Sequence, residues 1–75
     1  MEDKIMAILN DINPEILEYT GNTMLEDGII DSFAVLDILS ALEDEFDIEI
    51  DAEYAVSENF ANKEAIIEMM KILKE

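Results

Sequence analysis

Residues 31–46 read DSFAVLDILSALEDEF, and this stretch predicts the longest helix of the chain. At about 100° of rotation per residue its apolar side chains share one face, which consists of Val35, Ile38, Leu39, Leu42 and Phe46. The opposite face carries Phe33, Asp37, Ser40 and Asp44, and Leu36 lies between the two faces. Asp31 is the predicted N-cap, because its carboxylate can accept hydrogen bonds from free N–H groups of the first turn. The sequence therefore predicts a helix over residues 32–46 with an acidic outer face.

Two further helices are predicted on either side of this stretch. The first covers residues 2–11, where Ile5, Ile8, Leu9 and Ile12 recur at the spacing of one helical face. It ends before Pro14, since proline has no N–H to continue the helix, and a short turn is expected over residues 15–17. The last helix covers residues 63–74 behind a capping Asn62, and its apolar stripe consists of Ile66, Met70 and Leu73.

The connecting segments complete the predicted fold. Residues 13–30 are long for a loop of a small domain, and their apolar side chains indicate that they pack across the helices. Residues 47–51 alternate apolar and acidic side chains, but no second strand is available, so we expect an extended loop that turns Ile48 and Ile50 inward. Residues 57–60 predict a short helical turn, and Tyr19 and Tyr54 are expected in loops without a chemical role. We predict a single all-α domain over residues 1–75, a small four-helix bundle of three main helices and one short helix.

The charge of the chain is strongly negative. There are 20 acidic residues and 4 lysines, which gives a net charge of −16. Nucleic acids and anionic membranes would repel such a chain, whereas basic patches on other proteins would attract it. No apolar run approaches the roughly 20 residues of a membrane span and no signal-peptide core is present, so we expect a cytoplasmic protein that does not insert into membranes. The absence of cysteine excludes disulfides and thiolate metal sites.

Ser32 is the residue on which the functional interpretation depends. The chain contains no His, Cys or Arg, and Asp31 is too weak a base to activate a serine hydroxyl, so a hydrolase is disfavoured and the protein is not expected to be an enzyme. A helix N-terminus instead favours an anion. Gly28 allows a sharp turn before the serine, and Phe33 places an aromatic ring among acidic side chains, where a partner could bind it. This pattern indicates an attachment site.

The segment Gly28-Ile29-Ile30-Asp31-Ser32-Phe33, the helix that follows it and its Phe46-x-Ile48-x-Ile50 ending resemble the phosphopantetheine attachment site of the acyl carrier protein family. Length, acidity and the order of the helices extend the resemblance to the whole chain. The resemblance implies that Ser32 carries a 4′-phosphopantetheine arm, which a separate phosphopantetheinyl transferase transfers from coenzyme A. The thiol of the arm would hold cargo as a thioester. Asp31 would cap the helix and help the transferase to recognise the site.

The resemblance also implies how partner enzymes dock. The helix over residues 32–46 would be the recognition helix, with Phe33 and Leu36 as apolar anchors. Asp37, Ser40 and Asp44 would lie on the surface that meets basic patches of the partners. These partners would be the transferase, a ligase that loads an acyl or aminoacyl group, and downstream acyl-processing enzymes. We expect the carrier itself to be a monomer.

Departures from the usual family pattern bear on the cargo. Fatty-acid carriers usually have leucine and then aspartate after the serine, and often methionine farther along the helix, whereas this chain has Phe33, Ala34 and Ser40. The stretch from Phe46 to Phe60 is also slightly longer than in those carriers. We expect a carrier of acyl groups in fatty acid or specialised acyl biosynthesis, and the alternative is a D-alanyl or other aminoacyl carrier.

Two other classes of protein fit the sequence less well. If an EF-hand calcium loop started at Asp47, the acidic residues Glu49, Asp51 and Glu58 would also fall at ligand positions, but Ala52 stands where the sharp turn requires glycine. We therefore expect no specific metal site. An adaptor protein that binds helices without modification of Ser32 is the other alternative.

Overall fold

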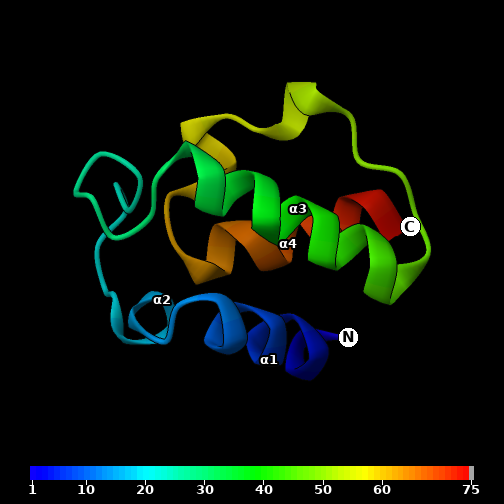
Figure 1. Cartoon of the computed structure of the whole chain (residues 1–75), viewed down its shortest axis with the longest axis horizontal. Helices are drawn as coiled ribbons and strands as arrows, with labels where there is room; N and C mark the ends of the chain where they lie inside the picture. Colours follow the sequence, from blue (N-terminus) through cyan, green and yellow to red (C-terminus); the bar gives the residue numbers. More distant parts are fainter. Residues whose placement is uncertain (75) are drawn as a thin grey trace.

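The computed structural model describes residues 1–74 and consists of helices joined by turns and loops (Figure 1). The α-helices are α1 (Glu2–Ile12), α2 (Glu15–Glu18), α3 (Ser32–Phe46) and α4 (Lys63–Lys74), and two 3₁₀ turns, η1 (Ala52–Tyr54) and η2 (Ser57–Phe60), lie between α3 and α4. No strand occurs within residues 1–74. The predicted all-α bundle of three main helices is confirmed. None of the helices described is long and apolar enough to cross a membrane.

α3 begins and ends where the sequence predicts. Asp31 is extended (φ −118°, ψ −175°), and its carboxylate accepts a hydrogen bond from the Ala34 N–H at 2.8 Å. At the other end Asp47 adopts the left-handed conformation (φ 53°), and its N–H donates to the Glu43 carbonyl. The predicted apolar face points inward, since all of its members are buried except Phe46, which is half-buried.

α1 and α2 each extend one residue beyond the predicted end. Ile12 is still helical, and Asn13 ends α1 in an extended conformation while its N–H donates to the Leu9 carbonyl at 2.9 Å. The side-chain oxygen of Asn13 also accepts the Glu15 N–H at 3.0 Å, so one residue closes α1 and opens α2. α4 spans the predicted residues, and the predicted cap is confirmed by a 2.9 Å hydrogen bond from the Ala65 N–H to the Asn62 side chain.

The core receives side chains from all four helices and from the segments between them. It consists of Ile5, Leu9, Ile16, Met24, Ile30, Val35, Ile38, Leu39, Leu42, Ile50, Phe60, Ile66, Met69 and Met70, all of which are apolar. Ile50 is buried and Ile48 is half-buried in an extended segment, which confirms the predicted inward turn of this loop. η1 was not predicted, because residues 52–54 carry no apolar period.

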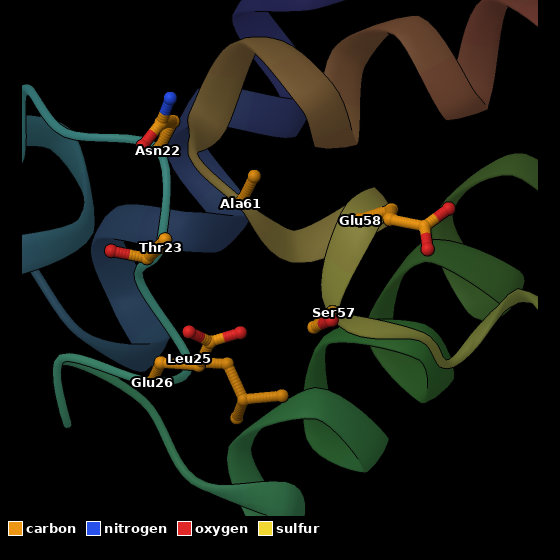
Figure 2. Close-up of a pocket in the computed structure, with 7 residues that line it drawn as sticks. All are labelled: Asn22, Thr23, Leu25, Glu26, Ser57, Glu58 and Ala61. Atoms are coloured by element: carbon orange, nitrogen blue, oxygen red, sulfur yellow. The ribbon is translucent and has the colours of Figure 1, made fainter.

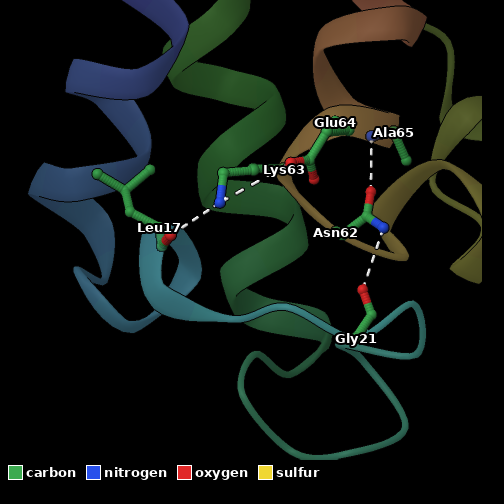
Figure 3. A network of polar contacts seen from close by, with 6 residues as sticks. All are labelled: Leu17, Gly21, Asn62, Lys63, Glu64 and Ala65. Atoms are coloured by element: carbon green, nitrogen blue, oxygen red, sulfur yellow. Dashed lines mark hydrogen bonds and ion pairs between the residues drawn. The ribbon is translucent and has the colours of Figure 1, made fainter.

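Polar contacts fasten α2 and the loop that follows it to the start of α4 (Figure 3). Lys63 Nζ donates to the Leu17 carbonyl at 2.9 Å. Its neighbour Asn62 donates to the Gly21 carbonyl at 3.1 Å with the amide whose oxygen caps α4. These bonds connect residues more than 40 positions apart. The segment before α3 is therefore held against the bundle, as the sequence predicts.

The opposite ends of the bundle differ in what they carry. The loop between α2 and α3, which leads into Ser32, lies at one end, and the N-terminus and the last turn of α4 lie at the other (Figure 1). At that second end Lys71 of α4 lies 3.4 Å from Glu2 of α1, and Lys4 of α1 lies 3.8 Å from Glu45 of α3. The attachment site predicted at Ser32 is therefore remote from these ion pairs.

Candidate functional site

Ser32 is the first residue of α3, and its side chain is exposed. The Asp31 carboxylate is directed to the Ala34 N–H, and the Asp31 carbonyl accepts the Val35 N–H at 3.1 Å. These bonds leave the N–H groups of Ser32 and Phe33 without a hydrogen-bond acceptor among the residues that the structure describes. The serine hydroxyl thus lies beside two free backbone donors at the positive end of a helix of 15 residues.

The turn before Ser32 depends on Gly28. Gly28 has a φ of 81°, a conformation that residues with a Cβ rarely adopt, and its N–H donates to the Leu25 carbonyl at 3.3 Å. Two residues later Ile30 is buried in the core, and it anchors the chain immediately before Asp31. The glycine that the sequence singled out therefore provides the turn expected of it, and the isoleucines fix where α3 begins.

The predicted partner-binding residues all lie on the outer side of α3. The side chain of Phe33 is 76% exposed and that of Leu36 is 56% exposed, and their i, i+3 spacing makes them neighbours on the surface of α3. Asp37, Ser40 and Asp44 are exposed as well. The recorded contacts of the four lysines involve other residues, namely Glu2, Leu17, Glu45, Phe46 and Glu64. This face therefore combines apolar side chains with carboxylates that, within residues 1–74, no lysine contacts.

An open groove of about 290 Å³ runs between the end of α1 and the start of α3. Its lining brings together three of the predicted site residues, Asp31, Phe33 and Asp37, with Gly28 and Ala34. Leu36, Ser40 and Asp44 lie farther along α3 and do not line it. The structure thus divides the predicted surface into a groove beside Ser32 and an exposed stripe on α3.

A second pocket, of about 340 Å³, lies between the loop before α3 and η2 (Figure 2). The 3.0 Å hydrogen bond from the Met24 N–H to the Ala61 carbonyl joins its two walls. Leu25 and Ala61 supply apolar surface, and Glu26 and Glu58 supply carboxylates. No pattern in the sequence indicates this pocket, because its two walls are more than 30 positions apart and meet only in the folded chain.

The hydroxyl of Tyr19 organises the loop between α2 and α3, although the sequence predicted no role for it. Tyr19 Oη accepts the Thr23 N–H at 2.9 Å and donates to the Asp27 carboxylate at 2.5 Å. Thr23 Oγ1 donates to the same carboxylate oxygen at 3.0 Å. The hydrogen bonds from Tyr19 and Thr23 lower the pKa of Asp27, because both favour the charged carboxylate. A side chain at Gly21 would collide with the Tyr19 ring and hydroxyl.

The acidic residues from Asp47 to Glu58 do not assemble into a ligand set. In the part of the chain that the structure describes, no three or more His, Cys, Asp or Glu side chains are grouped so that they could hold a metal ion. Glu43, on the neighbouring α3, instead accepts the Ile50 N–H at 2.8 Å and fastens the extended loop to the helix. The Glu43 carboxylate therefore has a structural role, because it accepts a hydrogen bond from the backbone of the loop.

Comparisons of the chain with known protein families, with characterised proteins and with solved structures find no match. The function is therefore inferred from the chain's own residues, from their resemblance to a known attachment motif and from the geometry around Ser32.

Proposed function

We propose that the chain is an acyl carrier protein whose Ser32 bears a 4′-phosphopantetheine arm. The observation that carries the proposal is an exposed serine at the first position of α3, beside the free N–H groups of Ser32 and Phe33. The chain has no histidine, cysteine or arginine that could make this serine a nucleophile of its own. A serine in such a place is suited to accept a group from another enzyme and is poorly suited to catalysis.

The residues around Ser32 fit the phosphate that would join the arm to the protein. A phosphodiester oxygen can accept hydrogen bonds from free N–H groups at a helix N-terminus, where the helix dipole also favours negative charge. The Asp31 carboxylate is engaged by the Ala34 N–H at 2.8 Å, and so it holds the first turn of α3 in place. The open groove on one side of Ser32 leaves room for the arm to leave the surface.

Attachment would require chemistry that this chain does not supply. The Ser32 Oγ–phosphorus bond would form as the pyrophosphate bond of coenzyme A breaks, 3′,5′-adenosine diphosphate would leave, and the transferase would take the hydroxyl proton. Once bound, the arm would supply a thiol that carries acyl groups as thioesters. The role of this protein would be to present Ser32, to hold the N-terminus of α3 rigid and to offer a docking face.

The outer face of α3, which includes the groove beside Ser32 and the exposed stripe beyond it, is the proposed docking face. Phe33 and Leu36 would enter apolar pockets of a transferase, loading ligase or acyl-processing enzyme, and Asp37 and Asp44 would meet basic residues around those pockets. Charges of one sign on this face would accelerate encounter and make it sensitive to salt. The proposed setting is the cytoplasm, with the carrier acting as a monomer.

An aminoacyl carrier is the second candidate, and the pocket between the α2–α3 loop and η2 favours it. Glu26 and Glu58 in its lining would attract the ammonium group of an aminoacyl cargo. A long fatty acyl chain would instead have to displace side chains such as Ile38 and Leu42, which are fully buried. Thermal melting of loaded protein distinguishes the two, since shelter of an octanoyl chain would raise the melting temperature and an alanyl group would not.

The test of the proposed function is the intact mass of the purified chain after incubation with coenzyme A and a broad-specificity phosphopantetheinyl transferase. We expect the addition of one phosphopantetheine group to the natural sequence and none to Ser32→Ala. Ser40→Ala is the matched control, because Ser40 is also exposed on α3 but does not lie at its N-terminus. Absence of the addition from the natural sequence would refute the carrier function and favour an adaptor.

A further inference from the structure

We propose that Tyr19 is a positioning residue for the modification of Ser32, because its hydroxyl locks the loop that leads into α3. The inference rests on the proposed carrier function and adds to it a control on how the site is presented. The lock consists of Tyr19, Thr23 and Asp27, which are joined by hydrogen bonds across the whole loop. None of these residues belongs to the attachment motif itself.

Several hydrogen bonds join the three residues of the lock. Tyr19 is the C-terminal cap of α2, and its Oη lies 2.9 Å from the Thr23 nitrogen and 2.5 Å from Asp27 Oδ2. Thr23 Oγ1 donates to the same Asp27 oxygen at 3.0 Å, and the Asp27 N–H returns to the Thr23 carbonyl at 2.8 Å. The hydroxyl therefore ties the end of α2 to two points of the following loop.

Both glycines of the chain suit the path of the loop around this hydroxyl. At Gly21 a side chain would overlap the Tyr19 ring and hydroxyl, so the backbone passes where only glycine fits. Gly28 follows Asp27 directly and turns the chain with its positive φ of 81° toward Ile29 and Ile30. A tyrosine hydroxyl, rather than apolar packing alone, thus defines the course of residues 19–28.

Little apolar packing orders this loop, although Gly21 is hydrogen-bonded to Asn62 and Met24 to Ala61. Met24 is its only buried residue, and Leu25 is half-buried, whereas the other residues from Thr20 to Gly28 are exposed. The loop also lines both of the pockets described above, since Thr23 and Leu25 border the pocket near η2 and Gly28 borders the groove near α1. A transferase that approaches Ser32 would contact this loop, and a loosened loop would have to become ordered on binding.

α3 itself is anchored independently of the lock. Ile30 is buried, and the Asp31 carboxylate caps the helix through the Ala34 N–H. Loss of the Tyr19 hydroxyl should therefore leave the helix and the serine hydroxyl intact. We expect the cost to fall on recognition of the apo protein by the transferase and not on the transfer step.

Tyr19→Phe tests the inference, because it removes the hydroxyl and keeps the ring. Tyr54→Phe is the matched control, since Tyr54 is the other tyrosine and its hydroxyl makes no hydrogen bond to the described residues. With coenzyme A and a phosphopantetheinyl transferase, we expect Tyr19→Phe to raise the KM for the carrier roughly three- to tenfold, as loss of one hydrogen bond of ordinary strength predicts, with kcat unchanged. Tyr54→Phe should change neither constant.

A second variant and a measurement of hydrogen exchange distinguish a loosened loop from a general folding defect. Asp27→Asn weakens the lock without touching the aromatic ring, and it should raise KM in the same direction as Tyr19→Phe. Hydrogen exchange of the Thr23 and Asp27 amides should accelerate in both variants, while exchange within α3 stays slow. An unchanged KM in Tyr19→Phe, or a fall in kcat alone, would overturn the inference while the carrier function stands. If the natural protein is not modified at all, both the carrier function and the inference fail.

Discussion

Asn13 at the end of α1 and Ile29 just before α3 are joined by a hydrogen bond of 3.0 Å, from the Asn13 side-chain nitrogen to the Ile29 carbonyl. The bond spans 16 positions of the chain and is partly buried. The oxygen of the same amide accepts the Glu15 N–H, so that a single side chain connects α1, α2 and the segment that leads into Ser32. The amide therefore sets the position of the segment before Ser32 relative to the first helix.

Removal of this amide should destabilise the fold. We expect Asn13→Ala to lower the free energy of unfolding by about 1–3 kcal/mol, because it leaves a partly buried carbonyl and a helix end without partners. Asn13→Asp keeps an oxygen for the Glu15 N–H but loses the donor to Ile29, so it should also destabilise. Urea denaturation measures both, with Asn10→Ala on the exposed side of α1 as the control. Equal stabilities of Asn13→Ala and the control would contradict the assigned role.

Two substitutions of the α3 cap, Asp31, should separate its contribution to the stability of the fold from its contribution to recognition by the transferase. Asp31→Ala should lower the free energy of unfolding by about 0.5–2 kcal/mol, because it removes the acceptor of the Ala34 N–H. Asp31→Asn should retain most of that stability, since asparagine is an equally good N-cap. If the carboxylate also contributes to recognition, Asp31→Asn should still be modified more slowly at Ser32. Transfer to Asp31→Asn at the natural rate would reduce the role of Asp31 to capping.

Phe33 should matter to partners and not to folding. Its side chain is 76% exposed, so Phe33→Ala should change the free energy of unfolding by less than about 0.5 kcal/mol. We expect the same variant to lower kcat/KM for the transferase or the loading ligase roughly tenfold, as loss of an aromatic anchor would. Ile72→Ala is the control, because Ile72 is 60% exposed on α4, away from Ser32. Equal kcat/KM losses in the two variants would argue against a docking face on α3.

The pKa of Asp27 should report whether the hydrogen bonds of the loop are intact. Its folded-state pKa lies below the ordinary value because Tyr19 and Thr23 donate to the carboxylate. The contribution of the charged Asp27 carboxylate to the stability of the fold is therefore complete above the unfolded pKa of about 3.9, and it is lost as the pH falls through the folded pKa. Tyr19→Phe should raise the titration midpoint of the Asp27 carboxyl carbon in NMR spectra. The same midpoint in both proteins would show that the hydroxyl does not hold the charged form.

The sequence predicts the helices well because their signals are local. α3 was placed correctly from the apolar period that starts after Asp31 and ends at Phe46, and α4 from Asn62 and its apolar stripe. α1 extended one residue past the prediction because Asn13, and not Asp11, ends the helix. The position of Ser32 at the start of α3 followed from the same local pattern.

Local sequence patterns do not predict the contacts of the loop that leads into Ser32. The pocket beside η2 depends on contact between Met24 and Ala61, which are far apart in the sequence. The bonds of Tyr19 reach residues four and eight positions away through an irregular loop, where no periodicity signals a partner. Local rules therefore place Ser32 at the start of α3, whereas the pocket near η2 and the hydrogen bonds of the preceding loop emerge only from the folded chain.

The hydrogen bond between Tyr19 and Asp27 also gives the protein an optical reporter. The chain has two tyrosines and no tryptophan, so its near-ultraviolet absorption and fluorescence come chiefly from Tyr19 and Tyr54. A phenol that donates to a carboxylate differs in its spectrum from one in water, and Tyr19 is the tyrosine that does so. One of the two tyrosine signals of the folded protein therefore originates at the start of the loop that leads into Ser32, and it responds to the state of that loop without any added label.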